Sequence, residues 1–297
     1  MELYTPTMKE LLRQIEQELM DSMPPTDTLQ ATVSKAMAYA CEEGGKRLRP
    51  LLVLLFARLC GGDEAAALPF AAAIEMIHCY SLVHDDLPCM DNSTVRRGRP
   101  STFAAFGEDM ALLAGDGLLN RAFEWGLSLR ASKAVGADRA LEAMRVLADA
   151  SGINGMVGGQ TIDLESEGKD IDLSTLQMLQ AGKTGALLTA ACEMGAVLGG
   201  ANEEKREAAR RYGMELGLCF QIVDDILDVT SSAEILGKPV GADADNRKVT
   251  FVSLLGLEAA KRYAEEHTQA ALRALSVFGE EAEELTALTT ALLRRNI

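Results

Sequence analysis

The sequence has 297 residues, of which 48% are hydrophobic and 25% are charged, and its formal net charge is −15 at pH 7. This acidic balance argues against a general nucleic-acid-binding protein, which needs a basic face. If the ligand is a polyanion, local basic clusters or metal ions must reverse the field where it binds.

The first twenty residues lack the apolar segment of a signal peptide and carry Glu2, Glu10, Glu16 and Glu18. No stretch approaches the roughly 20 apolar residues that span a bilayer. The six cysteines form no CxxC pair, and with only three histidines no zinc-ligand cluster is recognisable. We therefore expect reduced, buried cysteines in a cytoplasmic protein without stable membrane insertion.

The composition favours helices along the whole chain. No proline occurs between Pro100 and Pro239, and this stretch is rich in Ala, Leu, Glu and Met. Runs of Val, Ile and Thr with the alternation of a strand are missing. Because no linker or shift in composition divides the chain, the sequence predicts an all-α fold with a single domain over residues 1–297.

In chain order, the first predicted helix begins at a capping box formed by Thr7 and Glu10 and ends before Pro24. Further helices are predicted at about 28–43, 51–60, 64–84, 103–131, 136–157, 174–197 and 203–230, with two more at the end of the chain. Residues 88–100 and 231–248 are predicted loops because they concentrate proline, glycine and charged residues.

A stripe of polar residues marks one face of the predicted helix at 203–230. Gln221, Asp224, Asp225 and Asp228 are spaced i, i+3, i+4, i+7 among apolar neighbours. Like charges on one face repel, and burial raises that cost. Mg²⁺ would remove both penalties, because it takes oxygen ligands from one or two carboxylates and from substrate phosphates. The alternative interpretation is an exposed acidic edge.

A second group of aspartates closes the apolar helix at 64–84. Asp85, Asp86 and Asp91 lie in SLVHDDLPCMDN, where Pro88 interrupts the helix, so the spacing does not fix which way their carboxylates face. An ordinary acidic helix end is the alternative for this motif alone. Two aspartate motifs facing each other across a cavity could hold a diphosphate through bridging Mg²⁺ ions.

Basic residues supply charge of the opposite sign. The segment GGKRLRP, residues 44–50, combines a glycine turn with three cationic side chains, a pattern that suits an anion. A helix C-cap with solvated Lys and Arg is the alternative. Taken alone, His78 on its apolar helix is more typical of a hydrogen-bonded core residue. Further cations occur at Arg96, Arg97, Lys183, Lys238 and Lys248.

Five motifs in order resemble the bacterial farnesyl diphosphate synthase branch of the trans-isoprenyl diphosphate synthases: GGKRLRP, SLVHDDLPCMDN with RRGRP, Gly159–Gln160 with Asp163, GKTGALL, and FQIVDDILDVT with LGKPVGAD. They cover roughly residues 44–251. The resemblance implies an all-α isoprenoid synthase fold, a helical bundle around a deep central cavity, usually as a homodimer. It also implies head-to-tail condensation of isopentenyl diphosphate with dimethylallyl or geranyl diphosphate.

The resemblance also assigns roles to residues. It implies three Mg²⁺ ions held by Asp85, Asp91 and Asp224, with Asp86, Asp225 and Asp228 nearby. Isopentenyl diphosphate would be held by Gly45, Lys46, Arg49, His78 and Arg97. The allylic diphosphate would be held by Arg96, Lys183, Thr184, Gln221 and Lys238, with Lys248 nearby. Departure of the allylic diphosphate would leave a carbocation that the isopentenyl double bond attacks, and apolar walls would keep water away.

Product length is expected to depend on Tyr80, which lies roughly 7–8 Å deeper along the helix than Asp85. In this family an aromatic residue there, here beside the small Ser81, limits chain growth, so we expect a C15 product. An ordinary core tyrosine is the alternative, and with it a longer-chain synthase such as a geranylgeranyl diphosphate synthase. Ser93 and Thr94 replace acids, and Phe103 replaces a histidine, that are common in relatives; these changes bear on metal affinity, rate and substrate preference.

A terpene cyclase and a non-catalytic subunit of the same fold are less consistent with the sequence. Cyclases usually lack a second aspartate motif of this kind and the basic pairs for a second diphosphate. A non-catalytic subunit would be marked by loss of the aspartates, and they are present here.

Overall fold

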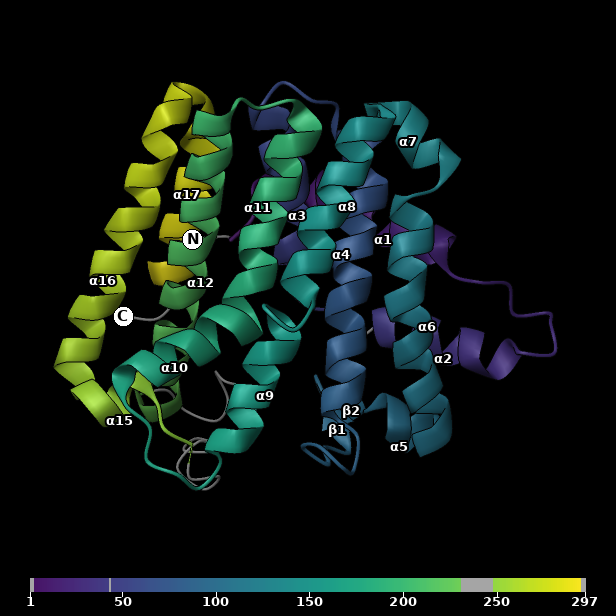
Figure 1. Ribbon diagram of the computed structural model, residues 1–297, viewed down its shortest axis with the longest axis horizontal. Coiled ribbons are helices and arrows are strands. Elements are labelled where there is room, and N and C mark those ends of the chain that lie inside the picture. The colour runs from purple at the N-terminus through teal and green to yellow at the C-terminus, as the bar shows by residue number, and fades with distance from the viewer. Residues whose placement is uncertain (1–2, 43, 231–247, 295–297) are drawn as a thin grey trace.

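A computed structural model describes residues 3–42, 44–230 and 248–294 of the chain, and its long helices lie side by side with nearly aligned axes (Figure 1). Its first half contains α1 (Pro6–Ser22), α2 (Ala31–Glu42), α3 (Leu48–Leu59), α4 (Glu64–Asp85), α5 (Thr102–Phe106), α6 (Glu108–Gly126) and α7 (Leu129–Val135). Its second half contains α8 (Ala137–Ser151), α9 (Met156–Ser166), α10 (Leu173–Gln180), α11 (Ala186–Gly199), α12 (Glu203–Thr230), α15 (Phe251–Leu255), α16 (Leu257–Ala274) and α17 (Glu283–Arg294).

Two short helical segments of other types complete this list. A π-helical turn, Ala181–Gly185, joins α10 to α11, and a 3₁₀ segment, Leu275–Ala282, joins α16 to α17. The strands that the structure describes are two residues long: β1 (Val95–Arg96) pairs antiparallel with β2 (Arg99–Pro100). This small hairpin lies within the predicted loop at 88–100, and the all-α expectation is confirmed.

The boundaries of several helices differ from the predictions. The cap of α1 is Thr5, whose hydroxyl accepts a hydrogen bond from Met8 N at 3.2 Å, so the capping box at Thr7 was wrong. Pro6 explains the earlier start, because proline suits the first helical turn. The single helix predicted at 103–131 is three helices, and Gly107, with a φ of 91°, provides the first break.

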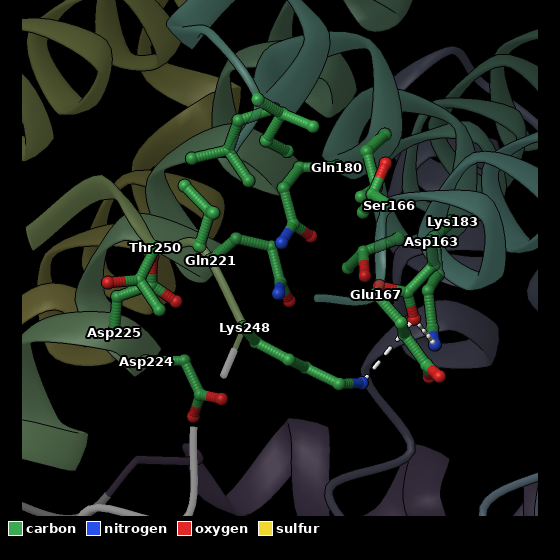
Figure 2. Close-up of a pocket in the computed structure, with 15 residues that line it drawn as sticks. Asp163, Ser166, Glu167, Gln180, Lys183, Gln221, Asp224, Asp225, Lys248 and Thr250 are labelled. Carbon is green, nitrogen blue, oxygen red and sulfur yellow. Dashed lines mark hydrogen bonds and ion pairs between the residues drawn. The ribbon is translucent and has the colours of Figure 1, made fainter. Parts of the chain in front are cut away.

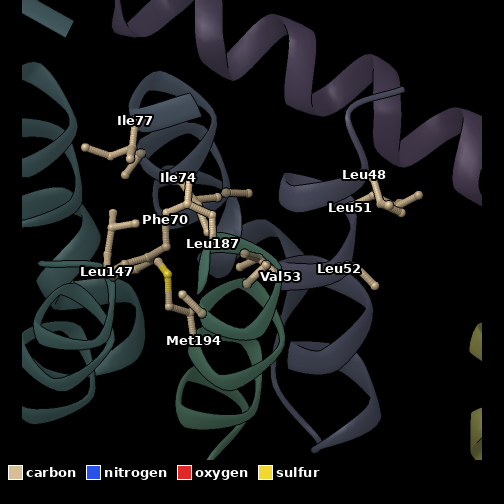
Figure 3. Close-up of a cluster of buried hydrophobic side chains, with 14 of the residues drawn as sticks. Leu48, Leu51, Leu52, Val53, Phe70, Ile74, Ile77, Leu147, Leu187 and Met194 are labelled. Atoms are coloured by element: carbon tan, nitrogen blue, oxygen red, sulfur yellow. The ribbon is translucent and has the colours of Figure 1, made fainter. Parts of the chain in front are cut away.

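Helix α4 is the central helix of the bundle and packs against α1, α3, α6, α8 and α11. By length and composition it is apolar enough to cross a membrane, so the prediction that no stretch approaches a span was wrong for this helix. However, 72% of its most apolar window is buried inside the protein, and core helices pass the same test. Figure 3 shows side chains of this buried cluster: Val53 of α3 lies near Leu187 of α11 and Ile74 of α4, whereas Leu51 and Leu52 of α3 point to the other side of that helix.

Helices α3 and α11 pack with their backbones unusually close. A Cβ added at Gly195 would lie 2.6 Å from Phe56 Cβ, so only glycine fits at this crossing. The ring of Phe56 in turn lies 5.4 Å from the ring of Tyr212 on α12 and 5.9 Å from that of Phe278. The aromatic contacts therefore join α3 to the 3₁₀ segment and to α12, which carries the second aspartate motif.

The loop before α3 is fixed by a buried arginine. Arg47 is 4% exposed; its Nε lies 2.7 Å from Glu16 Oε1 and its Nη1 lies 2.7 Å from Glu75 Oε1, while Nη2 donates to the carbonyl of Cys41. Arg47 also adopts a left-handed φ of 44°. Arg47 therefore joins α1 and α4 to the loop that carries the other two cations of this segment, Lys46 and Arg49.

We expect Arg47→Ala to lower the free energy of unfolding by about 3–5 kcal/mol, because it leaves Glu75 buried without its counter-charge. Arg13→Ala is the control, since Arg13 is 75% exposed beside Glu10 and should change stability by less than about 0.5 kcal/mol. Urea unfolding followed by circular dichroism measures both. Equal losses in the two variants would contradict a structural role for Arg47.

Candidate active site

Two cavities meet beside the π-helical turn. The first, which we call the aspartate cavity, has a volume of about 150 Å³ and is lined by α9, α10, α12 and residues 248–250. The second, which we call the arginine cavity, has a volume of about 570 Å³ and is lined by residues 45–49, α4, Arg97, α11 and α12. Thr184 and Gln221 line both cavities, so the two spaces adjoin at these side chains.

The structure distributes the predicted diphosphate ligands between these cavities. The arginine cavity is lined by all five residues predicted for isopentenyl diphosphate: Gly45, Lys46, Arg49, His78 and Arg97. The aspartate cavity is lined by four of those predicted for the allylic diphosphate, Lys183, Thr184, Gln221 and Lys248, together with Asp224 and Asp225. Arg96 lines neither cavity. Lys238 lies outside the described residues.

The π-helical turn explains how Lys183 and Thr184 reach the cavity. Residues 174–197 were predicted as one helix, but the α-helical spacing is interrupted at Ala181–Gly185. Such π-bulges are frequent at functional sites. Gly159 of α9 packs directly on this turn, where an added Cβ would overlap the backbone nitrogen of Lys183. Gly159 therefore has a packing role in this structure.

Asp85 is the last residue of α4 and lies among polar partners. Its Oδ1 accepts a hydrogen bond from Gln160 Nε2 at 2.6 Å, and its Oδ2 lies 3.9 Å from Lys183 Nζ. Burial raises the pKa of Asp85, while the charge of Lys183 opposes this rise and that of Asp91 adds to it. The Asp91 N–H donates to the Asp85 carbonyl at 2.9 Å, so the loop after α4 turns back toward the helix end.

Asp86 has a different environment from Asp85. Its side chain is 2% exposed, and its two carboxylate oxygens accept hydrogen bonds from Arg96 Nη2 at 2.7 Å and Nε at 2.8 Å. This bidentate ion pair fixes the hairpin to the end of α4. The predicted metal ligand Asp86 and the predicted diphosphate ligand Arg96 therefore bind each other in this structure.

The second aspartate motif lies on α12, whose bounds match the prediction of 203–230. Asp224 faces the aspartate cavity beside Gln221. Asp225 is 7% exposed and its Oδ2 accepts a hydrogen bond from the backbone N–H of Phe251 at 2.7 Å, which anchors the start of α15. Asp228 is 2% exposed. The burial of Asp225 and Asp228 rules out the alternative of an exposed acidic edge for these residues.

The sequence did not predict the role of Asp163. Its Oδ2 accepts a hydrogen bond from Lys183 Nζ at 2.7 Å and lies 3.5 Å from Lys248 Nζ (Figure 2). Burial alone would lower the pKa of Lys248, but the charges of Asp163 and Asp91 raise it above the usual lysine value. The available signal was the spacing from Gln160 to Asp163, i to i+3, which places both residues on one face of α9.

The side chains of the arginine cavity are suited to binding an anion. Arg49 Nε is buried and has no hydrogen-bond partner among the described residues. Burial lowers the pKa of Arg49, although the charge of Glu75 opposes this. Burial and the charges of Arg49 and Arg97 lower the pKa of His78 well below its usual value, so this imidazole is neutral. An anionic ligand would give Arg49 the acceptor that it lacks.

Arg97 reaches the arginine cavity from the hairpin that Arg96 fixes. Its guanidinium donates to the carbonyl of Gly44, and a Cβ at residue 45 would lie 2.8 Å from it, which accounts for Gly45. In the same cavity, Lys46 Nζ lies 5.0 Å from the centre of the Phe220 ring. Neither Phe220 nor Glu75, which also line this cavity, was predicted as a site residue.

The carboxylates fit Mg²⁺ only together with a phosphate ligand. Within the described ranges, no group of three or more His, Cys, Asp or Glu side chains is arranged to hold a metal by itself. Mg²⁺ is usually bound by one or two carboxylates and completes its shell with water and substrate phosphates. Asp224 lines the aspartate cavity, whereas Asp85 and Asp91 do not, although Asp85 Oδ2 lies 3.9 Å from Lys183 Nζ at its edge. Their carboxylates are oxygen donors of the type that Mg²⁺ takes, so the chemistry of the residues present fits a metal–diphosphate unit.

Tyr80 and Ser81 lie on α4, just over one helical turn before its last residue, Asp85. Tyr80 is 7% exposed, and its ring packs edge-on against that of His84 at a centroid distance of 5.8 Å. The Ser81 hydroxyl donates to the carbonyl of His78 at 2.8 Å. Neither residue lines the two cavities, so their role in chain length stays a prediction.

Comparison with known proteins supports the expected family. The model of the polyprenyl synthetase family matches residues 30–289. A farnesyl diphosphate synthase of Geobacillus stearothermophilus is 48% identical over 245 residues, which cover 82% of this chain and 82% of that protein. The chloroplastic geranylgeranyl pyrophosphate synthase 11 of Arabidopsis thaliana is 45% identical over 269 residues, which cover 89% of this chain and 75% of that protein.

The fold agrees with this assignment. The crystal structure of an FPP/GFPP synthase from Zymomonas mobilis matches with a TM-score of 0.86 and 40% identity, covering 97% of each chain. The expected isoprenoid synthase fold is therefore confirmed. This chain belongs to the polyprenyl synthetase family of prenyltransferases.

Proposed function

We propose that this protein condenses isopentenyl diphosphate head to tail with dimethylallyl and then geranyl diphosphate, giving farnesyl diphosphate and free diphosphate. It would thus combine dimethylallyltranstransferase and farnesyl diphosphate synthase activities. The observation that carries the proposal is the pair of cavities that adjoin at Thr184 and Gln221, each with its own cations. A reaction between two diphosphate esters needs two anion sites that meet at the reacting carbons.

The aspartate cavity is assigned to the allylic diphosphate, whose ester bond breaks. Lys183 and Lys248 point toward this space, and Thr184 and Gln221 supply uncharged hydrogen-bonding groups (Figure 2). Asp85, Asp91 and Asp224 would hold Mg²⁺, three ions by family resemblance, with Asp86, Asp225 and Asp228 supporting them. When bound, Mg²⁺ would stabilise the charge that develops on the departing diphosphate.

The arginine cavity is assigned to isopentenyl diphosphate, whose diphosphate stays attached. Lys46, Arg49 and Arg97 supply its positive charge, and the neutral His78 adds a hydrogen-bonding group without a further charge. Leu188 and Phe220 give part of the wall an apolar surface that excludes water from a carbocation. The proposed reaction needs no side-chain nucleophile, and the proton lost at the end would pass to the released diphosphate.

We also propose that the protein is a cytoplasmic homodimer. Support for a second copy comes from apolar side chains on α6, where Leu112 and Leu113 are each 47% exposed. Apolar residues exposed together are typical of protein interfaces.

A geranylgeranyl diphosphate synthase is the second candidate. It is favoured by the 45% identity to the Arabidopsis thaliana geranylgeranyl pyrophosphate synthase 11 and by the position of Tyr80 outside the lining of both cavities. The two candidates share the same chemistry and the same site, and they differ only in how many condensations occur before release.

We expect the purified protein with Mg²⁺ to convert isopentenyl diphosphate and geranyl diphosphate mainly to the C15 diphosphate, because one condensation fills the site. Chromatography of dephosphorylated products measures this. EDTA should abolish turnover, since the charge that develops on the departing diphosphate is then not stabilised by Mg²⁺. Absence of any condensation with dimethylallyl or geranyl diphosphate would refute the enzymatic proposal, and a main C20 product would select the second candidate.

For Tyr80→Ala we expect products longer than C15, because loss of the ring opens space along α4. Tyr80→Phe serves as the matched control, since it keeps the ring and should keep the C15 product. Mass spectrometry of the products distinguishes them. If Tyr80→Ala still stops at C15, this residue does not set the chain length.

A further inference from the structure

A carboxylate occupies the position where the proposed function needs positive charge. Asp163 Oδ2 lies 2.7 Å from Lys183 Nζ and 3.5 Å from Lys248 Nζ, so it contacts both lysines of the aspartate cavity. Its side chain is 14% exposed, while those of the two lysines are 25% and 29% exposed. Figure 2 shows the two ammonium groups converging on this carboxylate from different elements.

The backbone fixes this arrangement. Gly159 of α9 packs against Gly182 and Lys183 of the π-helical turn, where a side chain would not fit. Asp163 follows Gly159 by one helical turn, and its carboxylate therefore faces the lysine that follows Gly182. Lys248 reaches Asp163 from a different part of the chain, the segment just before α15.

The lysines have few other partners in the described structure. Lys183 Nζ also lies 3.9 Å from Asp85 Oδ2, at the limit of an ion pair, and this links it to the first aspartate motif. Glu167 lines the same cavity and adds negative charge, without a direct contact to either lysine in the described structure. Asp163 is thus the acid that would compete directly with a bound diphosphate for both lysines.

We propose that Asp163 is a positioning residue that takes the place of the allylic diphosphate in the empty site. It holds Lys183 and Lys248 extended into the cavity and is exchanged for diphosphate oxygens when substrate binds. The same competition weakens the hold on the diphosphate released after condensation. This inference rests on the proposed assignment of the aspartate cavity to a diphosphate.

Measuring diphosphate binding in the absence of metal distinguishes this competing role from a metal-mediated role and from a purely structural role. If Asp163 acted through a metal ion, its removal would change nothing when metal is absent. If it only supported the local fold, its removal would disorder the lysines and weaken anion binding. If it competes with the ligand, its removal must tighten anion binding, because two charged donors then lose their internal acceptor.

The experiment is calorimetric titration of inorganic diphosphate into the full-length protein in EDTA at low ionic strength. We expect Asp163→Asn to bind diphosphate roughly five- to tenfold more tightly than the parent. This gain in binding free energy is about what one ion pair contributes. Glu167→Gln is the matched control, because it removes the same charge from the same cavity, and we expect less than about a twofold change. Unchanged or weaker binding by Asp163→Asn would overturn the proposal, as would an equal gain in the control.

Steady-state kinetics with Mg²⁺ gives an independent readout. Inhibition by product diphosphate should strengthen in Asp163→Asn, whereas the KM for isopentenyl diphosphate should stay within about twofold, since Asp163 does not line the arginine cavity. If Asp163→Asn does not fold, as judged by its thermal transition, Asp163→Ser carries the same expectations. A parent protein that condenses substrates while neither variant gains diphosphate affinity would refute this inference alone. A parent protein without condensation would refute the proposed function.

Discussion

The constraint that shapes this site is electrostatic: a chain with a net charge of −15 has to bring two polyanions side by side. Coulomb repulsion between the ligands and the protein opposes binding unless cations are concentrated where the ligands lie. The two cavities meet this constraint differently. In the arginine cavity the lining charge is mainly cationic, whereas in the aspartate cavity two lysines share the space with several carboxylates.

The cations near the site fall into two groups with different tasks. Arg47 and Arg96 are held by carboxylates, and their ion pairs fix the loop before α3 and the hairpin after α4. Arg49 and Arg97, which follow them closely in sequence, are thereby presented to the arginine cavity. Adjacent residues of the same charge thus divide the work between supporting the loop and facing the ligand. Because Arg47 is strongly buried, removing either partner of its ion pair would leave an uncompensated buried charge.

Sequence reasoning predicted much of this arrangement and missed some of it for physical reasons. The bounds of α12 were predictable because regular helical spacing is a local signal. The five residues around the arginine cavity were instead assigned by family resemblance, since His78 taken alone was more typical of a core residue. The pairing of Asp86 with Arg96 was not, because Pro88 breaks the helical register and the hairpin turns back on the helix end. The role of Asp163 depends on two lysines that lie 20 and 85 residues further along the chain, a relation that no local pattern contains.

The π-helical turn at Ala181–Gly185 has an evolutionary consequence. It accommodates one more residue than regular α-helical spacing would, and this surplus sets the rotation of α11 relative to α10. Since each residue turns a helix by about 100°, a one-residue deletion here would swing the downstream side chains away from the cavities. The path from α10 to α11 therefore has to keep its residue count. Among relatives, insertions and deletions should therefore be rarer in this segment than its glycines and small side chains alone would suggest.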